Sequence, residues 1–558
     1  MKEITFYSTN NAWTNNGLMA MGHLMKNYEE EVDVEYNDDS ISLISKSDIP
    51  ITDYIAHALE TLAEKGTYNF STTFKILNNN EEMGSSHQPP QDYPTKNGIT
   101  KETIEINDKE REFLKKKKYN NNKNQQVWKM RMSYFGKEKN YLEIGLNLKT
   151  QSSFKKLVTY EKGKNVCPLC GLPTKSLVDI TQSFNPIFGE HHNNEPDGIS
   201  SDIRKKVRIC PKCVILCYFT LFDYFIPFYR TKGNKGKSYL SLPNTMDIEI
   251  LRKIFSNLSL KGQYIDFSDP SCTSYSTNIK NLPNTSKSAS LLALLHNIKN
   301  KYQDMNEVEE LTISFEPFEK EEFKMITDWL CISYDLRTHP RITHIKANEK
   351  IYEILEPLKD PKNDSDIFLV PHFLSKFSFD IFNENEVETF FNGILTLNPK
   401  KVADGLFRIS KESISNVNKI RVSYLPNNSS PIYLFTERFL KKIMGESTML
   451  EDELKEACKS VAETIGKGFR EDVGMLTKFA YSSGPNEFKK ALEDASFRLA
   501  KVTALDKGKS FYLNANYLEK IMNSLDQNNF SDAKTYFVSF MSAYVLSENY
   551  RQRKQKKE

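Results

Sequence analysis

Cys167-Pro-Leu-Cys170 and Cys210-Pro-Lys-Cys213 are the most informative stretches of this sequence. In each stretch a Cys-x-x-Cys turn places two thiolates about 3.5–4 Å apart, which is the length of one edge of a zinc tetrahedron. The sequence therefore predicts one structural Zn²⁺ bound by Cys167, Cys170, Cys210 and Cys213. Two disulfides, or two separate redox turns, are the alternative interpretations. A closed site with four protein ligands leaves no position for a substrate, which favours an architectural role.

The segment between the two cysteine pairs, residues 171–209, is longer than the usual gap in a zinc ribbon. The two pairs are therefore expected to flank an inserted loop. His191 and His192 lie in this segment, and replacement of one thiolate by either imidazole is an alternative to the four-cysteine site.

Composition restricts the class of protein. A chain of 558 residues is expected to form two to four domains, and its net charge of +3 provides no overall field for binding nucleic acid. Eight cysteines, four of them in the paired turns, suit a reducing cytoplasm. The N-terminus has no apolar signal region, and the longest apolar stretch, residues 214–229, is shorter than the ~20 residues that span a bilayer. A cytoplasmic protein without membrane association is the expectation.

The pattern along the chain predicts an α+β multidomain protein. Residues 1–77 form an N-terminal α+β segment, 78–126 a polar and partly mobile insertion, and 127–240 the zinc module. Residues 241–435 form a mixed α/β region without an interpretable motif, and 436–558 a C-terminal helical bundle. Its helices are expected around residues 454–465, 488–502, 518–525 and 533–544. Met444 is a possible internal start of translation that would yield this bundle alone.

The N-terminal segment contains a polar stretch that is a candidate for contacts with nucleic acid. Alternation of apolar residues predicts a strand near residues 4–6 and a hairpin over 32–43, with a short helix over 17–25 and another around 54–62. An Asn-rich loop precedes the first helix, and its candidate contact residues are Asn10, Asn11, Trp13, Asn15 and Asn16. The alternative is a loop folded onto its own domain, with Trp13 filling the core.

Basic clusters are the second group of candidate nucleic-acid contacts. Positive side chains close to glycines can approach phosphates, although a solvated surface is the alternative for each cluster. The candidates are Lys115, Lys116, Lys117 and Lys118; Arg204, Lys205 and Lys206; and Arg230, Lys232, Lys235 and Lys237.

Catalytic sequence motifs are not found in the chain. It has no Walker A sequence, no Gly-x-Ser-x-Gly elbow and no Gly-x-Gly-x-x-Gly loop. The sequence therefore favours a protein that is not an enzyme.

Two widely spaced Cys-x-x-Cys pairs in a chain of this length resemble the CRISPR-associated CXXC–CXXC family, which supplies the large subunit of the type I-B (I-A-like) Cascade surveillance complex. The stretch Thr9-Asn10-Asn11-Ala12-Trp13-Thr14-Asn15-Asn16-Gly17 is similar to the family's N-terminal Asn-Pro-aromatic-x-Asp-x-Gly loop, with Ala12 and Asn15 at the Pro and Asp positions. The aromatic run after Cys213 and the C-terminal helices also match. The specific part of the resemblance covers roughly the first 230 residues.

The resemblance implies a non-catalytic subunit of an RNA-guided DNA-binding complex. Such a subunit holds the end of the CRISPR RNA, recognises a short motif (PAM) in target double-stranded DNA, stabilises the opened duplex and recruits a helicase–nuclease. Its further partners are the other Cascade subunits, which form the backbone and bind the guide handle. The alternatives are a zinc-ribbon adaptor between proteins without nucleic acid, and a zinc-dependent nuclease.

Overall fold

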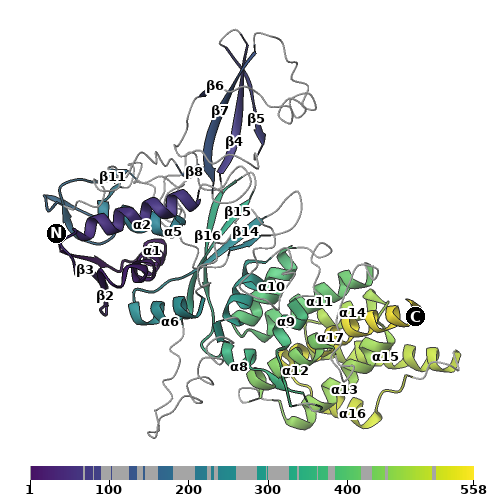
Figure 1. Ribbon diagram of the computed structural model, residues 1–558. Coiled ribbons are helices and arrows are strands. Elements are labelled where there is room, and N and C mark those ends of the chain that lie inside the picture. The colour runs from purple at the N-terminus through teal and green to yellow at the C-terminus, as the bar shows by residue number, and fades with distance from the viewer. Residues whose placement is uncertain are drawn as a thin grey trace, which may run out of the picture. The chain divides into compact units, whose positions relative to one another are not determined.

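The computed structural model describes residues 2–66, 70–78, 81–88, 102–103, 125–134, 143–144, 161–179, 208–222, 228–230, 237–258, 286–296, 298–299, 326–335, 338–360, 362, 364–374, 384–415, 430–445, 450–505 and 511–557. It is an α+β structure, as the sequence predicts (Figure 1). The chain divides into two compact units, one of Met1–Tyr275 with Glu322–His344 and the other of Ser276–Glu321 with Ile345–Glu558. None of the helices in the described part combines the length and apolar character needed to cross a bilayer.

The first unit begins with a small antiparallel sheet. Its strands are β1 (Glu3–Tyr7), β2 (Val32–Tyr36) and β3 (Ser40–Ser45), in the order β1-β3-β2. These strands confirm the predicted strand and hairpin. Ile4 and Phe6 on β1 and Ile41 and Leu43 on β3 are all buried. Alternating apolar residues thus place one face of the sheet against the core.

Helix α1 (Ala12–Met25) packs against this sheet together with α2 (Ile51–Gly66) and α5 (Pro211–Phe222). The sequence predicts a helix only from residue 17, but α1 begins at Ala12. The side chain of Asn11 explains the difference, since it accepts hydrogen bonds from the backbone N–H groups of Trp13 and Thr14 and so caps the helix. The Asn-rich stretch is therefore part of a helix and its cap.

Two larger sheets also lie mainly in the first unit. One contains β4 (Phe70–Asn78), β5 (Glu81–Gln88), β6 (Glu102–Thr103), β7 (Gln125–Tyr134) and β8 (Glu143–Ile144). The other contains β13 (Phe228–Arg230), β14 (Lys237–Pro243), β15 (Asp328–Asp335) and β16 (Thr338–Lys346), and α6 (Ile248–Leu258) lies between β14 and β15 in the chain. Strands β5 and β6 lie inside the stretch 78–126, which the sequence predicts to be a polar and partly mobile insertion. Strand β5 pairs with β4 and β6 pairs with β7, so these strands form although many of their residues are polar.

The second unit is mainly helical, and its helices begin well before residue 436. Residues 287–296 are helical. The later helices among the described residues are α8 (Ile351–Leu355), α9 (Leu369–Leu374), α10 (Glu384–Leu395), α11 (Pro399–Ser415), α12 (Pro431–Met444), α13 (Asp452–Gly468), α14 (Val473–Ala480), α15 (Pro485–Leu505), α16 (Ala515–Ser524) and α17 (Phe530–Lys557). Strands β17 (Leu358–Lys359) and β18 (Asp366–Ile367) form a short hairpin. The four helices expected at the C-terminus correspond to α13, α15, α16 and α17.

Phenylalanine rings fill the core of this helical unit. The ring of Phe537 on α17 lies 5.1 Å from that of Phe479 and 5.0 Å from that of Phe488, between ring centroids. Helix α17 also packs against α11 and α12, so its apolar surface is shared among helices on both sides of Met444. A fragment starting at Met444, which is the buried last residue of α12, would lack two of the partners of α17.

The stability of the helical unit is expected to fall as the pH rises. Burial, followed by the nearby carboxylate of Glu412, raises the pKa of Glu386 on α10 from 4.5 to about 7. The folded state thus holds this proton more tightly than the unfolded state, so the stabilising contribution is complete below pH 4.5 and is lost as the pH rises through 7. The melting temperature of the wild type should fall between pH 5 and pH 8, and that of Glu386→Gln should fall by less. The carboxylate of Glu471 is exposed, so the control variant Glu471→Gln should show the same fall in melting temperature as the wild type.

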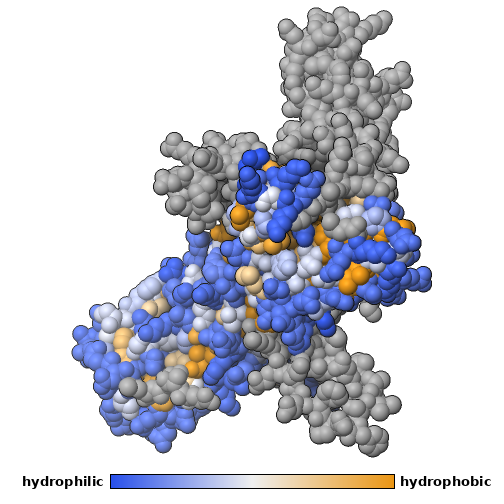
Figure 2. All heavy atoms as spheres, turned by 90° about the vertical axis from the view of Figure 1, so that its left-hand side faces the viewer, coloured by the Kyte–Doolittle hydropathy of each residue, from blue (hydrophilic) through white to orange (hydrophobic). Residues whose placement is uncertain are grey.

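The surface of the described residues is mainly hydrophilic on the face shown in Figure 2, where hydrophobic residues form separate small patches.

Candidate metal centre

The first cysteine pair lies at the tip of a short hairpin. Strands β9 (Asn165–Val166) and β10 (Pro173–Thr174) pair antiparallel on either side of the turn. Within the turn, the N–H of Gly171 donates to the Cys167 carbonyl oxygen at 2.9 Å, and the N–H of Cys167 donates to the Leu172 carbonyl at 3.0 Å. Gly171 has a φ of +69°, a conformation that glycine adopts without strain. These bonds fix the direction of both thiols.

The second pair lies at the start of a helix. Strand β12 (Arg208–Ile209) pairs with β11 (Val178–Asp179) and leads into Cys210, which directly precedes α5. Cys213 is in the first turn of α5. At this end of the helix the Val214 N–H donates a hydrogen bond to the Cys210 carbonyl oxygen at 3.1 Å. The N-terminus of a helix carries partial positive charge, which acts in favour of a thiolate at this position. Hydrogen bonding with Cys167 and the other thiols, together with burial, acts in the opposite direction and raises the pKa of Cys210 and of Cys213.

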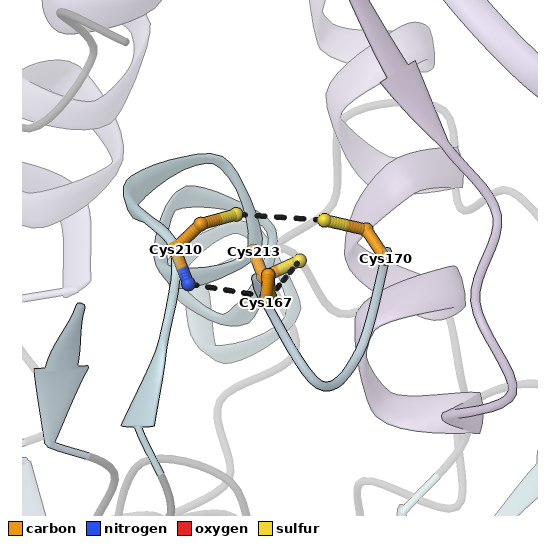
Figure 3. Close-up of side chains that lie close together, drawn as sticks. All are labelled: Cys167, Cys170, Cys210 and Cys213. Carbon is orange, nitrogen blue, oxygen red and sulfur yellow. Dashed lines mark hydrogen bonds between the residues drawn. The ribbon is translucent and has the colours of Figure 1, made fainter. Parts of the chain in front are cut away.

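The four thiols converge on one point, as Figure 3 shows. The sulfur of Cys167 lies 3.8 Å from that of Cys213, and the sulfur of Cys170 lies 3.6 Å from that of Cys210. All four sulfur atoms are within 4.8 Å of one another. A tetrahedral zinc site with Zn–S bonds of about 2.3 Å has sulfur–sulfur edges of about 3.8 Å. The cysteines are free thiols, and their arrangement is consistent with a metal site rather than with two disulfides.

The thiols strongly shift one another's pKa values, because they are close together and largely buried. A hydrogen bond from Cys170, with others from Cys210 and Cys213, lowers the pKa of Cys167. The backbone N–H of Cys210 also donates to the Cys167 sulfur at 3.3 Å. Hydrogen bonding to Cys167 and burial raise the pKa of Cys213. One thiolate therefore forms easily in this cluster, whereas four thiolates together need a cation to offset their repulsion.

Lys212, between the two cysteines of the second pair, connects the cluster to the N-terminal sheet. Its ammonium group donates to the backbone oxygen of Thr5 on β1 at 2.7 Å and lies 5.7 Å from the centroid of the Phe6 ring. Burial lowers the pKa of Lys212, and the neighbouring thiols act in the opposite direction. The sequence offered no reason to single out this lysine, since its role depends on the packing of β1.

Helix α5 continues from the cluster into the core of the first unit, where it crosses α1. The Thr220 hydroxyl donates to the backbone oxygen of Trp13 at 2.6 Å. A Cβ added to Gly17 would lie only 1.8 Å from the backbone oxygen of Leu216, so only glycine permits this approach. The four-cysteine cluster and the N-terminal α+β segment are therefore parts of one core.

The Asn-rich stretch lies mostly inside this core. Asn11, Trp13, Asn15 and Asn16 are buried, whereas Asn10 is exposed. This corresponds to the alternative in which the stretch folds onto its own domain with Trp13 in the core. Trp13 itself is completely buried.

Asn15 has a specific structural role in the described residues. Its side-chain amide donates to the backbone oxygens of Thr9 and Thr245, at 2.7 and 2.8 Å, and its oxygen accepts from the Thr9 N–H at 2.8 Å. A carboxylate here would have no hydrogen to donate to the two carbonyls. Asparagine at this position is thus explained by the local hydrogen bonds.

The basic candidates lie largely beyond the described residues. Lys115, Lys116, Lys117, Lys118, Arg204, Lys205, Lys206, Lys232 and Lys235 are all outside them, as are His191 and His192. Arg230 ends β13 and Lys237 begins β14, and these strands pair antiparallel with Arg230 opposite Ser238. The structure thus brings Arg230 and Lys237 to adjacent ends of one hairpin.

In comparisons with known proteins, no family model matches this chain, and no curated protein matches it either. The resemblance to the CXXC–CXXC family therefore stays a prediction.

Proposed function

We propose that the four-cysteine cluster binds one structural Zn²⁺. Thiolates are soft ligands that suit zinc, and the four sulfur atoms already have nearly tetrahedral separations. Three of the four cysteines are buried, and all four positions around the ion would be occupied by protein. The ion would hold the β9–β10 hairpin against the start of α5.

We propose further that the chain is a non-catalytic large subunit of a cytoplasmic type I CRISPR RNA-guided DNA-binding complex. The observation that carries this proposal is the cluster itself, which is closed to substrate and built into the same core as the N-terminal helix α1. This arrangement agrees with the order of elements that the family resemblance implies, including a helical C-terminal unit.

The proposed sharing of target recognition between the guide RNA and the protein has a physical basis. Where a guide RNA reads the target by base pairing, the protein needs only to recognise a short PAM and to hold nucleic-acid backbones. Local basic loops on a rigid core suffice for these contacts, and a large net charge is unnecessary. The pairing of β13 with β14, which places Arg230 and Lys237 at neighbouring strand ends, supports this proposal. Partners are the CRISPR RNA, target DNA, the other Cascade subunits and the helicase–nuclease.

Co-purification tests this proposal. The tagged chain, expressed with the products of its neighbouring genes, should purify with a discrete small RNA and with backbone and guide-handle-binding subunits. Protein partners without RNA would instead identify the chain as a zinc-ribbon adaptor. Degradation of DNA by the purified chain, abolished by chelation, would identify a zinc-dependent nuclease.

Neutralising the basic clusters is expected to weaken DNA binding at every sequence. For duplex DNA, removing one lysine or arginine that binds a phosphate should reduce the slope of log K against log salt concentration by about 0.9. Alanine substitutions at Lys115–Lys118, and separately at Arg230, Lys232, Lys235 and Lys237, should be compared in the assembled complex by titration at several salt concentrations. Unchanged affinity and slope in both variants would show that these residues form a solvated surface.

A further inference from the structure

Among the described residues, no strand pairs with the outer edge of β1 in the N-terminal sheet. Within this part of the chain β1 pairs with β3 alone, and the backbone hydrogen bonds at its two ends involve even-numbered residues: the Ser8 N–H donates to the Asp39 oxygen at 2.7 Å, and the Lys2 oxygen accepts from the Ser45 N–H at 2.8 Å. The backbone groups of Glu3, Thr5 and Tyr7 consequently point away from β3. Among the described residues, only the Lys212 ammonium bonds to this edge, at the Thr5 oxygen.

An open groove of about 450 Å³ runs along this edge. Glu3, Thr5 and Tyr7 form one side, and Leu172 and Pro173 of the metal-binding hairpin form part of the other. Tyr7 is 37% exposed, although it is a large aromatic side chain. The groove therefore combines apolar side chains with the outward-facing backbone groups of β1, of which the Thr5 oxygen accepts from Lys212. Apolar side chains and backbone groups at a sheet edge are the two features that an extended peptide uses when it adds to a sheet.

The charge of the groove indicates what such a peptide should carry. Lys162 and Lys212 both line the groove. Lys162 is exposed and forms no ion pair with any described residue. Two ammonium groups beside a peptide-binding edge favour acidic side chains on the incoming strand.

We propose that this groove binds an extended, acidic segment of another protein, which adds a strand to the free edge of β1. A nucleic-acid strand fits less well, because the edge presents backbone oxygens as well as N–H groups, and a sugar–phosphate backbone has no N–H groups to donate to those oxygens. Peptide backbone matches both kinds of group. This interaction does not depend on the nucleic-acid role proposed above, since it uses a different surface and a protein partner.

A short fluorescent peptide of alternating valine and glutamate is the probe for this proposal. Binding to the full chain is measured by anisotropy, with a valine–lysine peptide and an oligothymidylate of equal charge as comparisons. The acidic peptide should bind best. Lys162→Glu should weaken its binding about tenfold by reversing one charge beside the ligand. Lys164→Glu is the matched control, because Lys164 is also exposed but does not line the groove.

A second pair of variants tests the backbone pairing itself. Glu3→Pro removes the N–H at the first residue of β1, where proline is compatible with an edge strand, while Glu3→Ala keeps that N–H. Both variants remove the carboxylate, so weaker peptide binding by Glu3→Pro alone would assign the difference to the N–H. The proposal is overturned if the acidic peptide does not bind, if Lys162→Glu and Glu3→Pro bind it as the wild type does, or if the oligothymidylate binds more tightly.

Discussion

Cys170→Ser is expected to abolish stoichiometric zinc binding and to destabilise the first unit severely. The purified wild type should contain one zinc ion per chain by elemental analysis, because four convergent thiols form a complete ligand set. Removing one thiolate leaves three, and the binding energy that a structural metal adds to folding is lost with the ion. A loss of about 4 kcal/mol would lower the melting temperature of a unit of this size by roughly 10 °C.

Cys331→Ala is the matched control for this experiment. Cys331 is a completely buried cysteine on β15 of the same unit, but it is not in the cluster. Its variant should keep the zinc and lose the local contacts of one sulfur atom. Wild-type protein without zinc after purification in the absence of chelators would contradict the proposed metal site.

Gly17→Ala should destabilise the first unit by about 3 kcal/mol or more. The added Cβ would lie 1.8 Å from the Leu216 oxygen and 2.7 Å from the Thr220 hydroxyl. The nearer atom belongs to the backbone of α5, so rotation of a side chain cannot relieve the clash and the two helices must separate. Separation would also lengthen the hydrogen bond from Thr220 to the Trp13 oxygen.

Gly484→Ala provides the comparison, because the nearest atom to a Cβ there is 3.9 Å away. Denaturant unfolding of both variants measures the two effects under the same conditions. Equal stability of Gly17→Ala and the wild type would show that α1 and α5 do not cross as closely as described.

Local patterns of sequence predicted the parts of the fold that depend on local rules. The strand at residues 4–6 and the hairpin of β2 and β3 follow from period-two alternation, and the cysteine spacing identified a cluster that the structure assembles. The C-terminal helices followed from the spacing of apolar residues such as Leu454 and Val461. Each of these signals comes from residues that are only a few positions apart in the chain.

The remaining features depend on contacts between distant segments. The interpretation of Asn11–Asn16 as a loop followed from their polarity, but these side chains cap α1 and bond to Thr9 and Thr245. Trp13 is buried because α5, some 200 residues later in the chain, covers it. Lys212 likewise acquires its role only from the nearby edge of β1. None of these contacts has a signature in a window of neighbouring residues.

The crossing of α1 and α5 also has a consequence for how the protein is made. Helix α1 is completed at residue 25, but α5 ends only at residue 222, so a ribosome adding ~5–20 residues per second needs roughly 10–40 s to supply the covering helix. During this interval the apolar side chains of α1 have no α5 to pack against. Nascent chains stalled before residue 210 should therefore engage a chaperone, and chains stalled well beyond residue 222 should release it.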